Sequence, residues 1–167
     1  MKRSTDRILT THVGSLARPD RQLELLFAKE RGQPYDADEF ETSTRQAVDQ
    51  IVSRQAELGI DVVCDGEQSK ASFVTYAAER LTGFSPRQEE GENLWVNSRE
   101  SLAFPEFYEA HRKAREGLVA KAVRLECTDA VQYVGHEIVA RDVENVQRAA
   151  DKRNEEEVFM TAISHSE

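Results

Sequence analysis

A short, mainly apolar run from Ile60 to Cys64 is the feature that most restricts how this chain can fold. It directly follows a helical segment that ends at Gly59. A run of this kind is typical of a strand covered on both faces, as in parallel sheets flanked by helices. Asp65 and Glu67 come immediately after it, at the edge where (β/α) barrels assemble their active sites. Carboxylates there could bind an ammonium group, a metal ion or a proton; alternatively, Asp65 only turns the chain and Glu67 is solvated.

Strand-like and helical segments alternate along the rest of the chain. Strands separated by helices of this length favour an α/β fold with parallel strands and right-handed crossovers. The mixed polarity of residues 83–104 predicts an inserted excursion rather than a core element. The predicted strands are 8–12, 60–64, 121–127, 131–134 and 158–163, and the predicted helices are 19–32, 38–59, 71–81, 105–116 and 135–152.

Composition narrows the class of protein and its partners. The formal net charge of -9 argues against nucleic-acid and anionic-membrane partners, which would repel it. No apolar run approaches the roughly 20 residues that span a bilayer, and the basic start has no apolar stretch of a signal peptide behind it. The two cysteines, Cys64 and Cys127, lie in strand-like contexts, so we expect buried free thiols in a reducing, cytoplasmic setting.

Four segments, taken together and in order, resemble the cobalamin-independent methionine synthase family. The first runs from Ile8 to Leu16 and is followed by Arg18 and Pro19; the second is the Gly-Glu pair with the Phe-Val-Thr-Tyr pattern that follows it. Residues 100–108 resemble a family insertion, and residues 127–136 resemble a family strand. That last segment has Asp-Ala where the family usually has Gly-Pro, and this difference suggests a changed substrate.

The resemblance implies a TIM-type (β/α)8 barrel of which residues 1–167 are the first half, a single incomplete domain. A complete barrel needs about 250 residues, and the strand near residues 158–164 lies near the middle of the family's barrel. An isolated half would expose an apolar sheet edge. We therefore expect a partner chain that completes the barrel, or a homodimer.

The same resemblance implies which residues bind a small thiol or amino-acid substrate. Gly14 and Ser15 match positions that hold the amino-acid part of homocysteine. Glu67 matches the acidic residue that contacts the amino group of the substrate, and Asp65 could tune Glu67 or hold the loop. His12 could ligate a metal or donate a hydrogen bond, although a lone histidine that ends a strand is more often structural.

The implied reaction is methyl transfer to a thiol held on zinc. A folate is a possible methyl donor, and the sequence leaves the identity of the donor open. In the family, zinc is held by residues of later barrel strands, so we expect zinc only in the complete barrel. We assign no metal ligand to this chain, although Cys64 and Cys127 with His12 invite the idea. Two alternatives stay open: a related zinc-dependent transferase that joins epoxides to thiols, and a non-catalytic subunit or truncated product that binds a partner.

Overall fold

A computed structural model describes residues 2–86, 98–114, 125–153 and 157–162. Trp95 and His165 lie outside these ranges, as do parts of the predicted strands 121–127 and 158–163. The helices are α1 (Asp20–Glu30), α2 (Ala37–Glu57), α3 (Phe73–Ala78), α4 (Arg99–Ala103), α5 (Pro105–Ala114) and α6 (His136–Asp151). The strands are β1 (Val63–Cys64), β2 (Phe84–Pro86), β3 (Leu125–Cys127) and β4 (Val158–Phe159).

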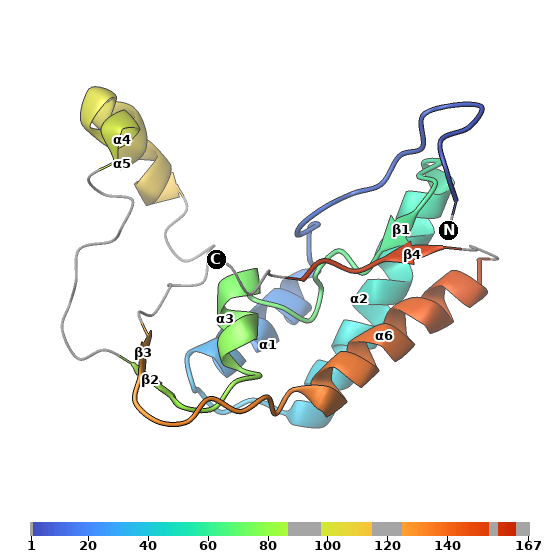
Figure 1. Cartoon of the computed structure of the whole chain (residues 1–167). Helices are drawn as coiled ribbons and strands as arrows, with labels where there is room; N and C mark the ends of the chain where they lie inside the picture. The colour runs from blue at the N-terminus through green and yellow to red at the C-terminus, as the bar shows by residue number, and fades with distance from the viewer. Residues whose placement is uncertain (1, 87–97, 115–124, 154–156, 163–167) are drawn as a thin grey trace.

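A small parallel sheet organises the main body (Figure 1). β1 pairs with β4 in parallel, with Val63 opposite Val158. On the other side of β1, Thr11 forms a single parallel bridge to Val62. Three segments that are distant in sequence thus run side by side in the same direction, and helices connect them. This confirms a mixed α/β fold with parallel strands.

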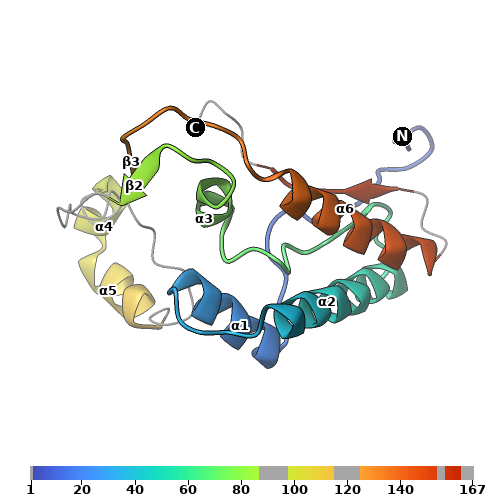
Figure 2. The same ribbon diagram turned by 90° about the horizontal axis from the view of Figure 1, so that it is seen from below.

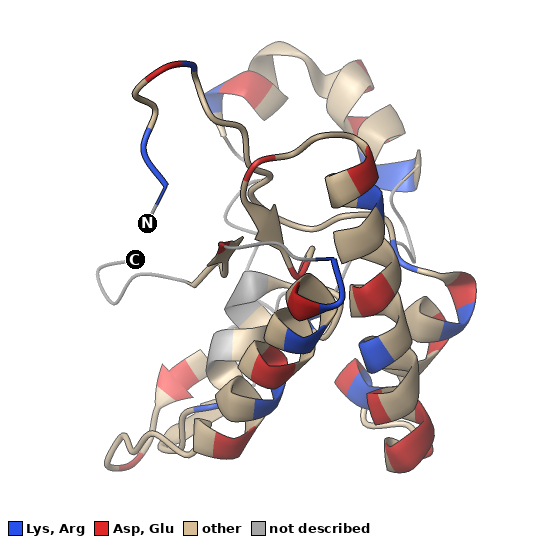
Figure 3. Ribbon diagram, turned by 90° about the vertical axis from the view of Figure 1, so that its right-hand side faces the viewer, with Lys and Arg blue, Asp and Glu red and all other residues tan. Residues whose placement is uncertain are grey.

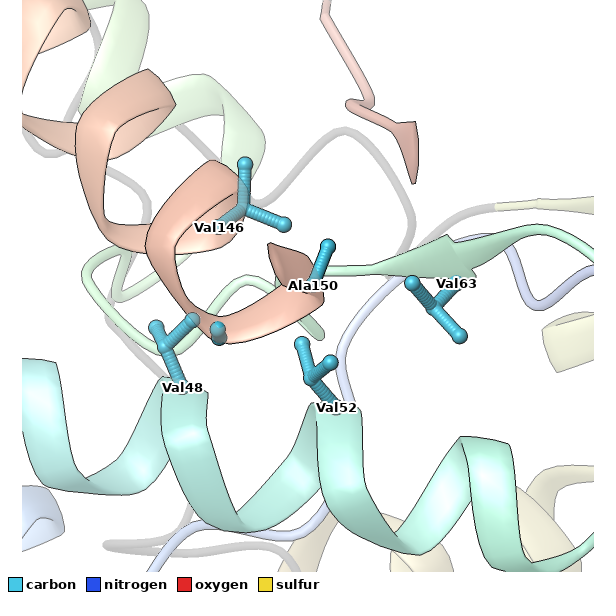
Figure 4. Packing of buried hydrophobic residues seen from close by; sticks show 6 residues of the cluster. Val48, Val52, Val63, Val146 and Ala150 are labelled. Atoms are coloured by element: carbon cyan, nitrogen blue, oxygen red, sulfur yellow. The ribbon is translucent and has the colours of Figure 1, made fainter. Parts of the chain in front are cut away.

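The main core lies where α2 and α6 pack together against the sheet (Figure 4). Val52, Val63 and Val146 are each 0% exposed. Burying an aliphatic side chain of this size contributes about 1.5–3 kcal/mol relative to leaving it exposed. These contacts join both crossover helices to the central strand. They therefore fix the position of the end of β1, where the loop after it begins.

The long helix α2 forms where its sequence predicts it, because both ends carry clear signals. Asp36 caps the N-terminus, with its carboxylate accepting a hydrogen bond of 3.0 Å from the Glu39 N–H. At the other end Gly59 has φ of 74°, a left-handed conformation that glycine adopts at little cost. Leu25 and Leu26 of α1 form a second small cluster with Phe40 of α2.

The predicted strand over residues 8–12 is wrong, since only Thr11 forms a bridge there. A side chain takes the place of a ladder. The Asp61 carboxylate accepts hydrogen bonds from the Thr10 N–H at 2.8 Å and the Thr10 hydroxyl at 3.0 Å, and it pairs with the Arg7 guanidinium. The Thr10 N–H, which a partner strand would otherwise bind, is thus bound to the Asp61 carboxylate, while the Thr10 carbonyl accepts the N–H groups of Asp61 and Val62.

The predicted strands over 121–127 and 131–134 also need correction. The described part of the first, β3, pairs antiparallel with β2 and takes no part in the parallel sheet. In the second, Tyr133 makes one isolated antiparallel bridge to Leu81. Both segments are exposed, so alternating apolar residues there do not signal a core. Cys127 is exposed, contrary to our expectation, whereas Cys64 is buried and both are free thiols.

The β2–β3 ribbon is the base from which the excursion leaves and to which it returns (Figure 2). Helices α4 and α5 lie apart from the main body, and Leu102, Phe104 and Phe107 are each more than 60% exposed. Basic and acidic side chains are interspersed along α2 and α6 (Figure 3), where Arg148 pairs with Asp49 at 2.9 Å. No helix in the described ranges is long and apolar enough to cross a membrane.

Candidate functional site

Three segments that follow the parallel sheet converge on the carboxylate of Glu67. The Ser15 hydroxyl donates a hydrogen bond of 2.6 Å to Glu67 Oε2, and the Thr161 hydroxyl donates one of 2.7 Å to Oε1. Ser15 follows the Thr11 bridge, Glu67 follows β1, and Thr161 follows β4. The carboxyl ends of neighbouring parallel segments therefore meet at one side chain, as they do in α/β sites generally.

The backbone at this site is unusual at two successive positions. Gly66 has φ of 59° and Glu67 has φ of 55°. A left-handed conformation costs a residue with a side chain roughly 1–2 kcal/mol, so Glu67 is held there by its surroundings. A Cβ at Gly66 would lie 3.1 Å from Leu16 Cβ, which also favours glycine at that position. The turn directs the Glu67 carboxylate back toward the other two segments.

Glu67 is 5% exposed, yet it is held as an anion. Burial alone would raise its pKa, but hydrogen bonds from Ser15 and Thr161, together with the charges of Lys70 and Arg18, outweigh burial and lower the pKa below its usual value. Each carboxylate oxygen accepts one of these two hydrogen bonds and has a second acceptor position. A buried, ionised carboxylate with spare acceptor capacity is suited to an ammonium group.

Two cations brace the loop that carries Glu67. The Arg18 guanidinium donates hydrogen bonds to the carbonyl oxygens of Glu67, at 2.9 Å, and Lys70, at 2.6 Å. Lys70 is 2% exposed; its ammonium lies 3.4 Å from Asp65 Oδ2 and donates a 3.3 Å hydrogen bond to the Thr161 carbonyl. Asp65 in turn accepts a hydrogen bond of 3.1 Å from the Glu67 N–H.

A second buried pair lies behind Lys70. The Tyr76 hydroxyl, on α3, donates a hydrogen bond to the Asp142 carboxylate on α6. The Lys70 ammonium lies 5.0 Å from the centre of the Tyr76 ring, and the Arg80 guanidinium lies 3.7 Å from it. Burial raises the pKa of Asp142, partly offset by the Tyr76 hydrogen bond. This pair links α3 to the long helix α6 beside the buried Lys70 ammonium.

The residues singled out from sequence are placed as follows. Ser15 and Glu67 are in direct contact, and Asp65 contacts the Glu67 N–H and the Lys70 ammonium. Gly14 has φ of 95° and lies beside Ser15. The Nε2 atom of His12 is buried and makes no hydrogen bond within the described part of the chain.

Sequence reasoning gave no role to Arg18, Lys70 or Thr161. Arg18 and Lys70 stand inside the segments that carry the family resemblance, three residues after Ser15 and Glu67 respectively, so their position was a usable signal. Thr161 gave no such signal. It lies in a strand-like segment, and its contact with Glu67 depends on how that segment packs in the folded chain.

The described residues do not suit zinc. They contain no group of three or more His, Cys, Asp or Glu side chains placed to hold a metal ion. The Cys64 Sγ atom instead lies 3.4 Å from Gln55 Oε1, and burial raises the pKa of its thiol, which disfavours the thiolate that zinc binds. We therefore derive no chemical step through a metal on these residues.

Comparison with known proteins identifies the class. The family model described as the catalytic domain of cobalamin-independent synthase matches residues 8–108, which is more than half of the chain. That span contains Gly14, Ser15 and the whole loop of Glu67. This chain belongs to the cobalamin-independent synthase catalytic-domain family.

Curated relatives give the nearest detail. The chain is 30% identical over 89 residues to the 5-methyltetrahydropteroyltriglutamate–homocysteine methyltransferase of Corynebacterium glutamicum, and 33% identical over 89 residues to that of Mycobacterium tuberculosis. Each match covers 53% of this chain and 11% of the relative, so the chain spans about a tenth of the length of the relatives it matches. The structure of a B12-independent methionine synthase from a Shewanella species, in complex with selenomethionine, is similar to this chain with a TM-score of 0.49 and 22% identity. The match covers 83% of this chain and 35% of that one.

Proposed function

We propose that this chain provides the amino-acid-binding part of a methyltransferase that acts on a thiol such as homocysteine. Family membership supports this reading, and so do the printed names of the curated relatives, which are homocysteine methyltransferases. The observation that carries it is the Glu67 carboxylate, buried and ionised, with hydroxyl groups from Ser15 and Thr161 on its two oxygens.

Substrate binding follows from the charges and donors at the site. The ammonium group of an amino acid would pair with Glu67 through the second acceptor position of its oxygens. The backbone N–H groups of Gly14 and Ser15 make no hydrogen bond within the described ranges, so they are available to a carboxylate. Ser15 itself is exposed and marks the side from which a ligand would enter. The methyl donor, a folate in the names of the relatives, and zinc would act elsewhere in the complete barrel.

Completion of the barrel belongs to the same proposal. Among the described residues, β4 pairs only with β1, and Phe159 of β4 is 39% exposed. Ile8 and Val13, on the other side of the sheet, are 85% and 66% exposed. We favour a partner chain that supplies further βα units over a homodimer, because it would also supply zinc ligands. Sedimentation velocity at low micromolar concentration tests this: a monomer that unfolds cooperatively would overturn it.

Calorimetric titration tests ligand binding. L-homocysteine and L-methionine should bind, whereas 4-mercaptobutyrate, which lacks the ammonium group, should bind at least about tenfold more weakly. Glu67→Gln should remove the preference for the ammonium, since it keeps the size of the side chain and loses its charge. Glu24→Gln, on the exposed face of α1, is the matched control and should change nothing. Equal affinity for homocysteine and mercaptobutyrate would refute the assignment of Glu67.

A further inference from the structure

We propose that Lys70 is the positioning residue of the Glu67 site. It holds the Glu67 carboxylate in its binding geometry through two neighbours, one bound to the Glu67 backbone and one bound to the Glu67 side chain. Its ammonium contacts two groups that each touch Glu67. Asp65, 3.4 Å away, accepts the Glu67 N–H, and Thr161, whose carbonyl lies 3.3 Å away, donates its hydroxyl to the Glu67 carboxylate. Lys70 itself makes no hydrogen bond to the Glu67 side chain among the contacts the structure shows.

Lys70 is buried, so its charge requires partners at fixed positions. At 2% exposure, a lysine ammonium is expensive to keep charged unless charged or polar groups surround it. Here one carboxylate, one carbonyl and the face of the Tyr76 ring surround it. Because few partners are available, the loop after β1 and the segment after β4 have to stay where Lys70 can reach both. A buried cation therefore fixes the separation of the two segments whose side chains meet at Glu67.

A merely space-filling residue would not need this charge. The left-handed backbone of Glu67 stores strain that the loop must resist, and the bond from Asp65 to the Glu67 N–H resists it directly. Without the ammonium, Asp65 Oδ2 would lose the cation that pairs with it, and the Thr161 carbonyl would lose its donor. Glu67 would then relax away from the Thr161 hydroxyl, and its carboxylate would lose both a hydrogen bond and a nearby positive charge.

The titration of Glu67 gives a readout that a residue which only filled space would leave unchanged. The groups that face it are Lys70 and Asp65 from its own loop, Arg18 and Ser15 from the N-terminal segment, and Thr161 after β4. The charge of Lys70 and the hydrogen bond from Thr161 both lower the Glu67 pKa. In Lys70→Met the pKa should therefore rise through the lost charge, and rise further if Thr161 moves away from the carboxylate. Lys70→Arg, which keeps the charge, should restore much of the low value. Carbon-detected NMR of labelled glutamate side chains follows this titration without any ligand.

The binding arm of the experiment rests on the proposed function and is separate from the titration arm. Affinity for L-homocysteine should fall about tenfold in Lys70→Met, the effect of misplacing one hydrogen bond to a charged group. Lys113→Met, on the exposed face of α5, is the matched control and should change neither quantity. If the wild-type chain binds no amino acid, the proposed function fails while the titration still decides the role of Lys70.

The deciding results are distinct. A raised Glu67 pKa in Lys70→Met, with wild-type far-UV circular dichroism, supports the inference. An unchanged Glu67 pKa together with a lower free energy of unfolding would overturn it, since Lys70 would then only stabilise the fold. Should Lys70→Met fail to fold, Lys70→Gln keeps a donor for the Thr161 carbonyl without the charge and is read by the same criteria.

Discussion

The Tyr76 hydroxyl is the perturbation whose energetic effect follows most directly from the structure. Tyr76 and Asp142 are each 5% exposed and share a hydrogen bond between α3 and α6. Tyr76→Phe keeps the ring, and with it the packing of Lys70 and Arg80, but removes the donor. A hydrogen bond to a charged group contributes about 1.5–3 kcal/mol, and a bond to a neutral one contributes about 0.5–1.5 kcal/mol. The loss should therefore depend on whether Asp142 is ionised.

The pH dependence has a definite sign. Burial raises the pKa of Asp142, and the Tyr76 hydrogen bond opposes that effect. Folded Asp142 therefore binds its proton more tightly than the unfolded chain does, and its contribution to stability falls as pH rises above the unfolded value of about 3.9. Removing the Tyr76 hydroxyl raises the folded pKa further and extends this fall to higher pH. The destabilisation by Tyr76→Phe should be larger at neutral pH than under mildly acidic conditions.

Urea unfolding with linear extrapolation, carried out across this pH range, measures the difference. Tyr108→Phe is the matched control; Tyr108 is 36% exposed on α5, and its change should stay within about 0.5 kcal/mol. A loss by Tyr76→Phe that is the same at every pH would refute the account of Asp142. A loss no larger than that of the control would refute the buried hydrogen bond itself.

Four further outcomes are expected. The lowered pKa of Glu67 contributes stability that is fully present above the unfolded pKa of about 4.3 and is lost as pH falls through the folded pKa. The difference in unfolding free energy between wild type and Glu67→Gln should therefore become smaller in urea titrations below that pH. Val52→Ala, at a side chain with 0% exposure, should cost about 2–3 kcal/mol in the same assay, from two lost methyl groups and the cavity they leave. Gly66→Ala should cost about 1–2 kcal/mol, because its φ of 59° disfavours any side chain; Gly32→Ala, which has open space around it and φ of 63°, separates this backbone effect from the contact with Leu16. Dialysed protein should carry well below one zinc ion per chain by metal analysis, and a tight equimolar site lost in Cys64→Ala would contradict this.

Local signals in the sequence were enough for the position of the Glu67 loop and for every described helix except α4, which lies in the predicted excursion over residues 83–104. The bounds of α2 follow from Asp36 and Gly59, and the loop follows from a buried run that ends at Cys64. β1 and β4 lie within the strands predicted at 60–64 and 158–163. The absence of a strand over 8–12 could not be predicted, because the Thr10 N–H bonds the Asp61 carboxylate in a way that no periodicity reveals. Nothing in the sequence around Lys70 indicates that it is buried, because its ammonium bonds the Thr161 carbonyl, about ninety positions further along the chain. Contacts of that kind are set by tertiary packing rather than by local pattern.

The β2–β3 ribbon has a consequence for engineering. Pro86 pairs with Leu125. The chain therefore leaves the ribbon after Pro86 and re-enters it at Leu125, the residue directly opposite. Joining the two strands directly would delete α4 and α5 together with their connections, and the length of a connection between fixed ends enters stability mainly through closure entropy, about 0.6 kcal/mol per doubling. A two-residue Asn-Gly turn joining β2 to β3 would make an ordinary hairpin. The same junction would accept a reporter domain or an affinity module, because the two strands already hold its ends opposite each other.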